Sequence, residues 1–105
     1  MKVYAYKVTD EAESDAKEIF EWYENKLQGL GNRFLSHIEN SLNKIALNPF
    51  AYANTGFLDF RRFVLDVFPY KIYYLLKDDI IIITAIIHKS RSQRYWRKKL
   101  KKRKY

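Results

Sequence analysis

Four residues in the last third of the chain have side chains that could together cleave RNA without a metal ion: Lys71, His88, Arg91 and Tyr95. Such cleavage needs a base for the 2′-hydroxyl, an acid for the leaving oxygen and cations against the charge that develops on the phosphate. His88 is the candidate acid or base, and Lys71 and Arg91 are the candidate charge stabilisers. Tyr95 offers a ring on which a base can stack. The alternative is that the long cations are solvated at a sheet edge and that His88 only caps a strand.

Other catalytic and metal-binding motifs are absent from the sequence. It contains no GxGxxG, P-loop or HExxH pattern, and it has two histidines and no cysteine. Since a zinc site needs several ligands at regular spacing, we expect no metal and no cofactor. His37 has neither a histidine nor a carboxylate four residues later, so we expect it at the surface or at the boundary of the core.

The C-terminal end carries the excess positive charge of the chain. Ten of the 20 lysines and arginines, and none of the 12 acids, lie between Lys89 and Tyr105, so the other 88 residues have a net charge of −2. This asymmetry predicts a polyanionic or acidic partner, and a solvated tail that aids solubility is the alternative. The residues expected to contact a target or a nucleic acid are Arg61, Arg62, Arg94, Trp96, Arg97 and Lys98.

Hydrophobic periodicity predicts a single α+β domain over residues 1–100, in the order strand, helix, helix and three strands. We expect the paired helices to cover one face of a small antiparallel sheet. Thr9-Asp10 and Glu13 are expected to form the capping box that begins the first helix. The expected elements are a strand at 3–8, a helix at 10–28, a second helix that ends before Pro49, a linker at 49–59, and strands at 60–68, 70–77 and 80–88.

The end of the chain is expected to belong to the domain only in part. Trp96 and Leu100 are four residues apart and would form the inner face of a short final helix. Residues 101–105 are expected to form a mobile basic tail, because terminal residues without apolar anchors are usually mobile.

An antiparallel meander divides the candidate cations between two ends of the sheet. The second strand begins where the third strand ends, and the fourth strand runs back along the third. His88 and Arg91 therefore fall near Lys71 at one end. Arg61 and Arg62 fall nearer the other end, unless the twist of the strands joins the two groups.

Nothing in the sequence indicates export or a membrane span. The first residues, MKVYAYKVTDEAESD, are polar and contain no signal-peptide core, and the apolar run at 80–87 is too short to cross a bilayer. The absence of cysteine suits a reducing compartment. We therefore expect a cytoplasmic protein with no membrane partner.

Several loose motifs follow one another in a specific order in RRFVLDVFPYKIYYLLKDDIIIITAIIHKSRSQRYW, residues 61–96. The most informative positions are Arg62, 68–74, 85–88, Arg91 and Trp96, and the helices add Ala12, Asp15, Ile19, Tyr23, Phe34, Ile38 and Pro49. Together they resemble the RelE/ParE superfamily, the toxins of type II toxin–antitoxin systems, from about Val8 to Arg97. The resemblance implies paired N-terminal helices on a small antiparallel sheet.

The superfamily that the sequence resembles has two branches with different targets. RelE-like members are ribosome-dependent mRNA endonucleases that use a few basic residues and a tyrosine near the C-terminus, whereas ParE-like members poison DNA gyrase without that set. By resemblance, Lys71 falls where the nucleases place an arginine, and Arg62 falls near one of their lysines. Arg91 falls near their arginine after the last strand, and Tyr95 or Trp96 near their terminal tyrosine.

Departures from the nuclease pattern favour the ParE-like branch. Lysine at position 71 lacks the forked reach of arginine to phosphate, and Val64 stands where a second cation is expected. The pattern H-x-x-R-x-x-x-x-W, from His88 to Trp96, looks more like ParE-like relatives. Many of those have an acid and a proline after the arginine, where this chain has Ser92-Gln93.

Three hypotheses follow, in order of preference. The first is a growth-inhibitory toxin that binds a macromolecular target such as DNA gyrase and is not a nuclease. The second is a ribosome-dependent mRNA endonuclease, and the third is a small RNA- or ribosome-binding module that binds through counterion release. For either toxin we expect a cognate protein antitoxin. Its extended segment or helix should cover apolar surface on the helices or the sheet, and its acids should meet the basic end.

Overall fold

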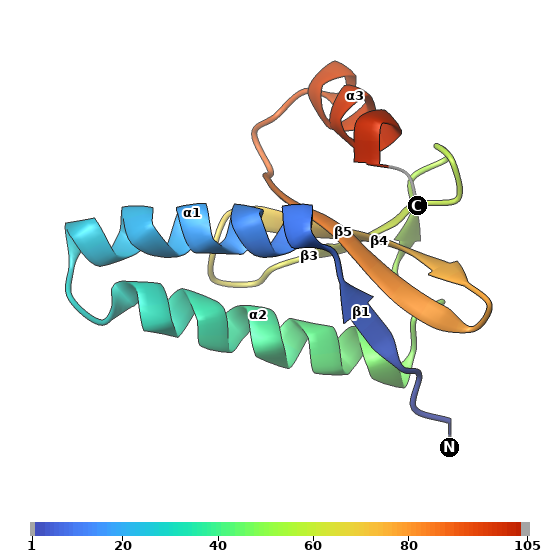
Figure 1. Cartoon of the computed structure of the whole chain (residues 1–105), viewed down its shortest axis with the longest axis horizontal. Coiled ribbons are helices and arrows are strands. Elements are labelled where there is room, and N and C mark those ends of the chain that lie inside the picture. The colour runs from blue at the N-terminus through green and yellow to red at the C-terminus, as the bar shows by residue number, and fades with distance from the viewer. Residues whose placement is uncertain (1, 104–105) are drawn as a thin grey trace.

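The computed structural model describes residues 2–103, which form one five-stranded sheet with helices on both faces (Figure 1). The elements are β1 (Tyr6–Val8), α1 (Asp10–Lys26), α2 (Leu30–Leu47), β2 (Ala53–Asn54), β3 (Arg61–Val64), β4 (Tyr70–Lys77), β5 (Ile80–His88) and α3 (Gln93–Arg103). The strand order across the sheet is β1-β5-β4-β3-β2. Helices α1 and α2 run side by side on one face, and α3 packs on the other.

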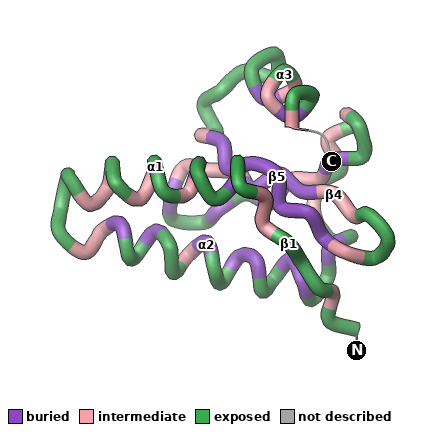
Figure 2. The backbone as a smooth tube through the Cα atoms, viewed as in Figure 1, coloured by how far each residue is buried: buried purple, intermediate pink, exposed green. Residues whose placement is uncertain are grey.

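Strand β5 is the centre of the sheet. It pairs with β4 in the antiparallel sense, with Lys71 opposite Ile87, and with β1 in the parallel sense, with Lys7 opposite Ile82. Residues 81–87 are all buried, because helices cover both faces of this strand (Figure 2). The predicted α+β fold is therefore confirmed, and the parallel pairing of β1 makes the sheet mixed.

A side-chain hydrogen bond fixes the start of α1. The hydroxyl of Thr9 accepts a hydrogen bond from the backbone N–H of Ala12 at 3.1 Å, so Thr9 is the N-cap. The third position of the helix is then Ala12 and not Glu13. The predicted capping box is wrong for this reason, although the predicted start of the helix is confirmed.

The turn between α1 and α2 is held by the carboxylate of Glu24. It accepts hydrogen bonds from the backbone N–H of Gly29, at 3.0 and 3.1 Å, and from that of Gly31, at 3.0 Å. Gly29 has a φ of +90°, which favours glycine. A Cβ atom on Gly31 would lie 2.7 Å from the carbonyl oxygen of Phe20, so glycine at this position lets the two helices approach closely.

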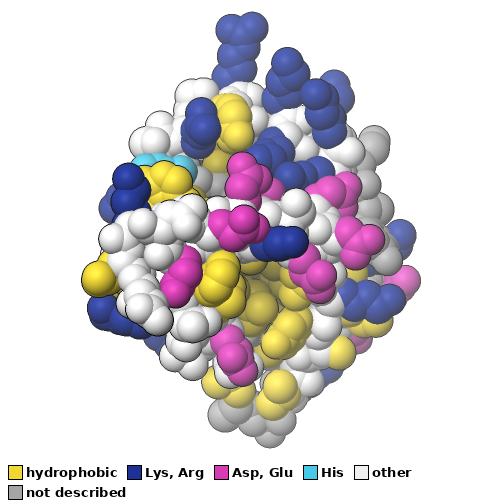
Figure 3. Space-filling model, turned by 60° about the vertical axis from the view of Figure 1, so that its left-hand side comes forward, with side chains coloured by type: hydrophobic (Ala, Val, Ile, Leu, Met, Phe, Trp, Pro, Cys, Tyr) yellow, Lys and Arg dark blue, Asp and Glu magenta, His cyan; other side chains and the backbone are white. Residues whose placement is uncertain are grey.

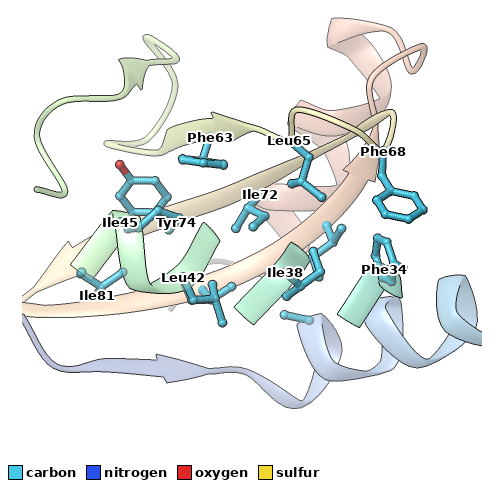
Figure 4. Close-up of a cluster of buried hydrophobic side chains, with 13 residues drawn as sticks. Phe34, Ile38, Leu42, Ile45, Phe63, Leu65, Phe68, Ile72, Tyr74 and Ile81 are labelled. Atoms are coloured by element: carbon cyan, nitrogen blue, oxygen red, sulfur yellow. The ribbon is translucent and has the colours of Figure 1, made fainter. Parts of the chain in front are cut away.

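The main core lies between the helical hairpin and the sheet (Figure 4). Tyr74 on β4 is fully buried, and its hydroxyl donates a hydrogen bond of 2.6 Å to the carbonyl oxygen of Pro49. Burial raises the pKa of Tyr74 to about 12. The buried residues of this core include Phe34, Ile38, Leu42, Ile45, Phe63, Leu65, Phe68, Ile72, Ile81, Ile83 and Ile86.

Some element boundaries differ from the predicted ones. Strand β1 begins at Tyr6 and not at residue 3, and β3 ends at Val64 because residues 65–69 form a loop whose Leu65 and Phe68 turn into the core. The expected linker contains the short strand β2, which pairs with β3. No helix in residues 2–103 is long and apolar enough to cross a membrane.

Helix α3 is longer than predicted. It continues through residues 101–103, so the expectation of a mobile tail from Lys101 is wrong for these three residues. Lys104 and Tyr105 lie outside the described residues. The predicted inner face is confirmed, because Trp96 and Leu100 are both buried against the sheet.

Candidate functional site

The candidate residues lie on and around α3, which covers part of the sheet face opposite the helical hairpin. Trp96 is 5% exposed, and its indole stacks on the ring of Tyr73 with centroids 5.3 Å apart. Trp96, which the sequence places among the target-binding residues, is therefore a core residue that positions α3. It shares this second core with Phe60, Tyr73, Ala85, Ile87 and Leu100.

Two arginines flank the indole of Trp96. The guanidinium carbon of Arg62 on β3 lies 5.8 Å from the ring centroid, and that of Arg97 lies 5.6 Å from it. Arg97 also lies 5.3 Å from the ring of Phe57. These cation–π contacts orient both guanidinium groups on the α3 face.

Lys71 and Lys89 add their charges to the same face of the sheet. Lys71 pairs with Val64 on β3, and Arg62 pairs with Tyr73, so Arg62 and Lys71 are diagonal neighbours on one face. Partial burial, together with the charges of Arg62 and Lys89, lowers the pKa of the Lys71 ammonium group. The sequence pattern places the candidate cations at two ends of a flat meander. In the structure, cations of the two groups therefore meet on one face through Arg62 and Lys71.

His88 belongs to the opposite face. It pairs with Tyr70, whose ring lies edge-on at 5.1 Å, and its Nδ1 accepts a hydrogen bond from the backbone N–H of Ser90 at 3.1 Å. Burial and the neighbouring Tyr23 raise the pKa of Tyr70. Because successive residues of a strand point to opposite faces, Lys71 and His88 are separated by the sheet itself.

His88, Arg91 and Tyr95 line a groove of about 490 Å³ between α1 and α3. The guanidinium carbon of Arg91 lies 4.4 Å from the centroid of the Tyr95 ring. Asp15 and Glu18 of α1 line the same groove. Three of the four predicted catalytic residues are thus brought together, beside two acids, of which Asp15 is ion-paired with Arg103.

The remaining predicted target-binding residues differ in exposure. The Nη1 atom of Arg61 donates hydrogen bonds to the carbonyl oxygens of Tyr52, at 2.8 Å, and Phe50, at 3.4 Å, so this arginine anchors the segment before β2. Arg94 and Lys98 are exposed on α3 and remain the simplest candidates for contact with a partner. Within residues 2–103, no three His, Cys, Asp or Glu residues are placed to hold a metal ion.

A buried ion pair, which the sequence patterns do not reveal as such, holds the far end of α3. Asp15 is 8% exposed and accepts a hydrogen bond of 3.0 Å from the backbone N–H of Ile86. Arg103 donates to both carboxylate oxygens of Asp15, and it also donates to the carbonyl oxygen of Thr84 at 3.2 Å. The only sequence signal is an acid on the apolar side of a helix, where an ionised group needs a partner.

The family model described as ParE toxin of type II toxin-antitoxin system, parDE, matches residues 6–93. The chain belongs to the ParE toxin family.

A solved structure supports the same fold for this ParE toxin. The similar chain comes from the chromosomal ParDE toxin–antitoxin system of P. aeruginosa, with a TM-score of 0.65 and 18% sequence identity. The likeness covers 82% of this chain and 96% of the other. A search of curated proteins gives no match.

The family confirms the resemblance read from the sequence. The ParE toxin is the toxin of a type II toxin–antitoxin system and has a cognate antitoxin as partner. The matched region contains the helical hairpin and the sheet and ends at Gln93, the first residue of α3. The cationic part of α3 therefore lies beyond the region that the family model describes.

Proposed function

We propose that this ParE toxin arrests growth by inhibiting DNA gyrase and does not itself cleave mRNA. The observation that carries the proposal is the position of Lys71 relative to His88. Their strand positions are adjacent in register, since Tyr70 pairs with His88 and Lys71 with Ile87, but their side chains leave opposite faces of the sheet. Lys71 therefore cannot act with His88 on one phosphate, and of the two candidate charge stabilisers only Arg91 shares a groove with His88.

Two assays on the same preparation test this proposal. Primer extension on mRNA from a translating extract should show intact messages, while the protein inhibits supercoiling by purified gyrase. A His88→Gln variant should inhibit gyrase as the parent does, since no step depends on the imidazole. Cuts at fixed codon positions, lost in His88→Gln, would instead support the nuclease hypothesis.

We also propose where the antitoxin binds. An apolar groove of about 300 Å³ lies between α1 and α2, and apolar side chains occupy the middle of this face (Figure 3). Its walls include Ala12, Ala16, Phe20, Leu35, Ile38 and Leu42. A helix or extended segment of the antitoxin would bury these side chains, and its acids would meet the cations that gather on α3.

A pair of adjacent substitutions tests the antitoxin site. Leu35→Glu places a charge in the groove, whereas Ser36→Glu places the same charge on the next exposed residue of α2. The first variant should lose the complex with the co-expressed antitoxin on gel filtration, and the second should keep it. Equal retention of the complex by both variants would exclude this groove as the binding surface.

A further inference from the structure

Three cations meet on the part of the sheet that α3 leaves uncovered. Arg62 comes from β3, Lys71 from β4, and Lys89 from the residue after β5. Arg62 and Lys71 are diagonal neighbours in the ladder. Lys89 follows the Tyr70–His88 pair, and its backbone N–H donates a hydrogen bond of 2.9 Å to the carbonyl oxygen of Pro69, two residues before Lys71. Val64, directly opposite Lys71, is 53% exposed, so this end of the sheet is open to solvent. We call these three residues the sheet cluster.

No acid among residues 2–103 forms an ion pair with the sheet cluster. Within residues 2–103 the ion pairs involve Lys2, Lys99 and Arg103, and none involves Arg62, Lys71 or Lys89. The cations of α3 that face α1 behave differently, since Lys99 and Arg103 both approach Asp15. Like charges that converge without a counter-ion cost free energy, and an anionic ligand would remove that cost.

The geometry of the sheet cluster suits phosphate. Arg62 presents a planar fork of donors that can bind a phosphate at two points, and Trp96 orients it from one side. Lys71 and Lys89 are point charges that tolerate different approach angles. Arg97 on the neighbouring helix flanks the same indole as Arg62 and extends the positive surface, which favours a repeating polyanion over a single small anion.

We propose that the sheet cluster of Arg62, Lys71 and Lys89 binds the sugar–phosphate backbone of duplex DNA, the substrate held by gyrase. The choice of duplex DNA rests on the proposed gyrase function, whereas the phosphate chemistry rests on the cluster alone. The toxin would then contact both gyrase and its DNA, and it would bind DNA weakly and without sequence preference in the absence of gyrase. Such contacts position a protein on a duplex without reading its bases.

Fluorescence anisotropy with a labelled DNA duplex, at several salt concentrations and without gyrase, tests the proposal. The double variant Lys71→Gln/Lys89→Gln should bind about tenfold more weakly than the parent, and its salt slope should fall by about two, one for each lost phosphate contact. The matched control Lys17→Gln/Arg33→Gln removes the same charge from exposed positions on the helical hairpin and should bind like the parent. Circular dichroism would show that both variants are folded.

The outcomes separate this inference from the proposed function. Equal affinity and equal salt slope in the two double variants would overturn the sheet cluster as the phosphate site. Single-stranded RNA of the same length that binds about tenfold more tightly than the duplex would overturn the choice of DNA. Because the binding assay contains no gyrase, either result leaves the supercoiling test intact. Failure to inhibit gyrase by a protein that binds DNA through the cluster would contradict the proposed function alone.

Discussion

The guanidinium group of Arg103, at the end of α3, donates hydrogen bonds of 2.6 and 2.9 Å to the carboxylate of Asp15 on α1. The two residues are 88 positions apart in the chain. Their ion pair joins helices that pack on opposite faces of the sheet, and the hydrogen bond to Asp15 raises the pKa of Arg103. With Trp96 buried at the other end, α3 is fixed to the domain at two points.

The first prediction concerns this ion pair. Arg103→Gln leaves the Asp15 carboxylate buried, with the N–H of Ile86 as a donor and the Lys99 ammonium 3.9 Å away. We expect the free energy of unfolding to fall by about 2–4 kcal/mol, because breaking a largely buried pair leaves one charge uncompensated. Urea denaturation followed by circular dichroism measures the change.

The matched control for that prediction is Lys101→Gln/Lys102→Gln, which alters exposed residues of the same helical turn. Its free energy of unfolding should stay within about 0.5 kcal/mol of the parent. If Arg103→Gln is as stable as this control, the ion pair does not hold α3. In a Trp22→Phe background, tryptophan fluorescence reports Trp96 alone and should shift to the red when α3 loosens.

The second prediction is that Lys71→Met stabilises the fold. The lowered pKa of Lys71 means that its ammonium form is less favourable in the folded chain than in the unfolded chain. Below the lowered pKa this cost is fully present, and it disappears as the pH rises towards the ordinary value of 10.5. At neutral pH the variant should gain about 0.5–1 kcal/mol, and the gain should shrink towards pH 10.5. A loss of stability at neutral pH would contradict the proposed destabilising effect of the Lys71 charge. Lys98→Met serves as the exposed control.

The third prediction concerns alkaline pH and Tyr74. Its pKa is raised to about 12 from 10.0, so the folded chain holds the proton more tightly than the unfolded chain. The resulting stability is present below pH 10 and is lost as the pH rises from 10 towards 12. Tyr74→Phe should cost about 1–2 kcal/mol at neutral pH, because the Pro49 carbonyl loses its hydrogen bond. Above pH 10 the variant should lose stability less steeply than the parent, and parallel curves would exclude Tyr74 as a source of the alkaline loss.

The fourth prediction is that Gly31→Ala destabilises the protein although alanine is the better helix former. The added Cβ would lie 2.7 Å from the backbone oxygen of Phe20, which is not free to move aside as a flexible side chain would be. We expect a net loss of about 1–3 kcal/mol, against a gain of up to about 1 kcal/mol from helix propensity. Thermal denaturation measures the change in stability. A Gly31→Ala variant more stable than the parent would mean that α1 and α2 move apart at this position without a loss of stability.

The sequence patterns were sufficient for the fold and insufficient for the site. Alternation and helical spacing predict the strand at 70–77 and the paired helices, and the continuous apolar run at 80–87 predicts a strand that is buried on both faces, as β5 is. They do not predict the parallel pairing of β1, which depends on a tertiary contact with Ile82, or the ion pair between Asp15 and Arg103. The roles of Trp96 and Arg61 were also not evident, because residue type alone does not distinguish an exposed aromatic or cation from a buried or tethered one.

The position of Lys71 relative to His88 shows why a set of catalytic residue types is not yet a catalytic site. Both residues fall at the same end of the sheet, as the meander predicts, and Arg91 and Tyr95 line one groove with His88. A difference of one position in register places Lys71 with Arg62 and Lys89, and His88 with Tyr70 on the opposite face. Only the structure resolves this difference.

The most direct test of the account is supercoiling of a relaxed plasmid by purified gyrase in the presence of this protein. Inhibition should reach completion at protein concentrations comparable with gyrase, and prior addition of the cognate antitoxin should abolish it. The same protein should leave mRNA intact in a translating extract. Undisturbed supercoiling at a large excess of protein, with cleavage of mRNA in the extract, would contradict the central claim.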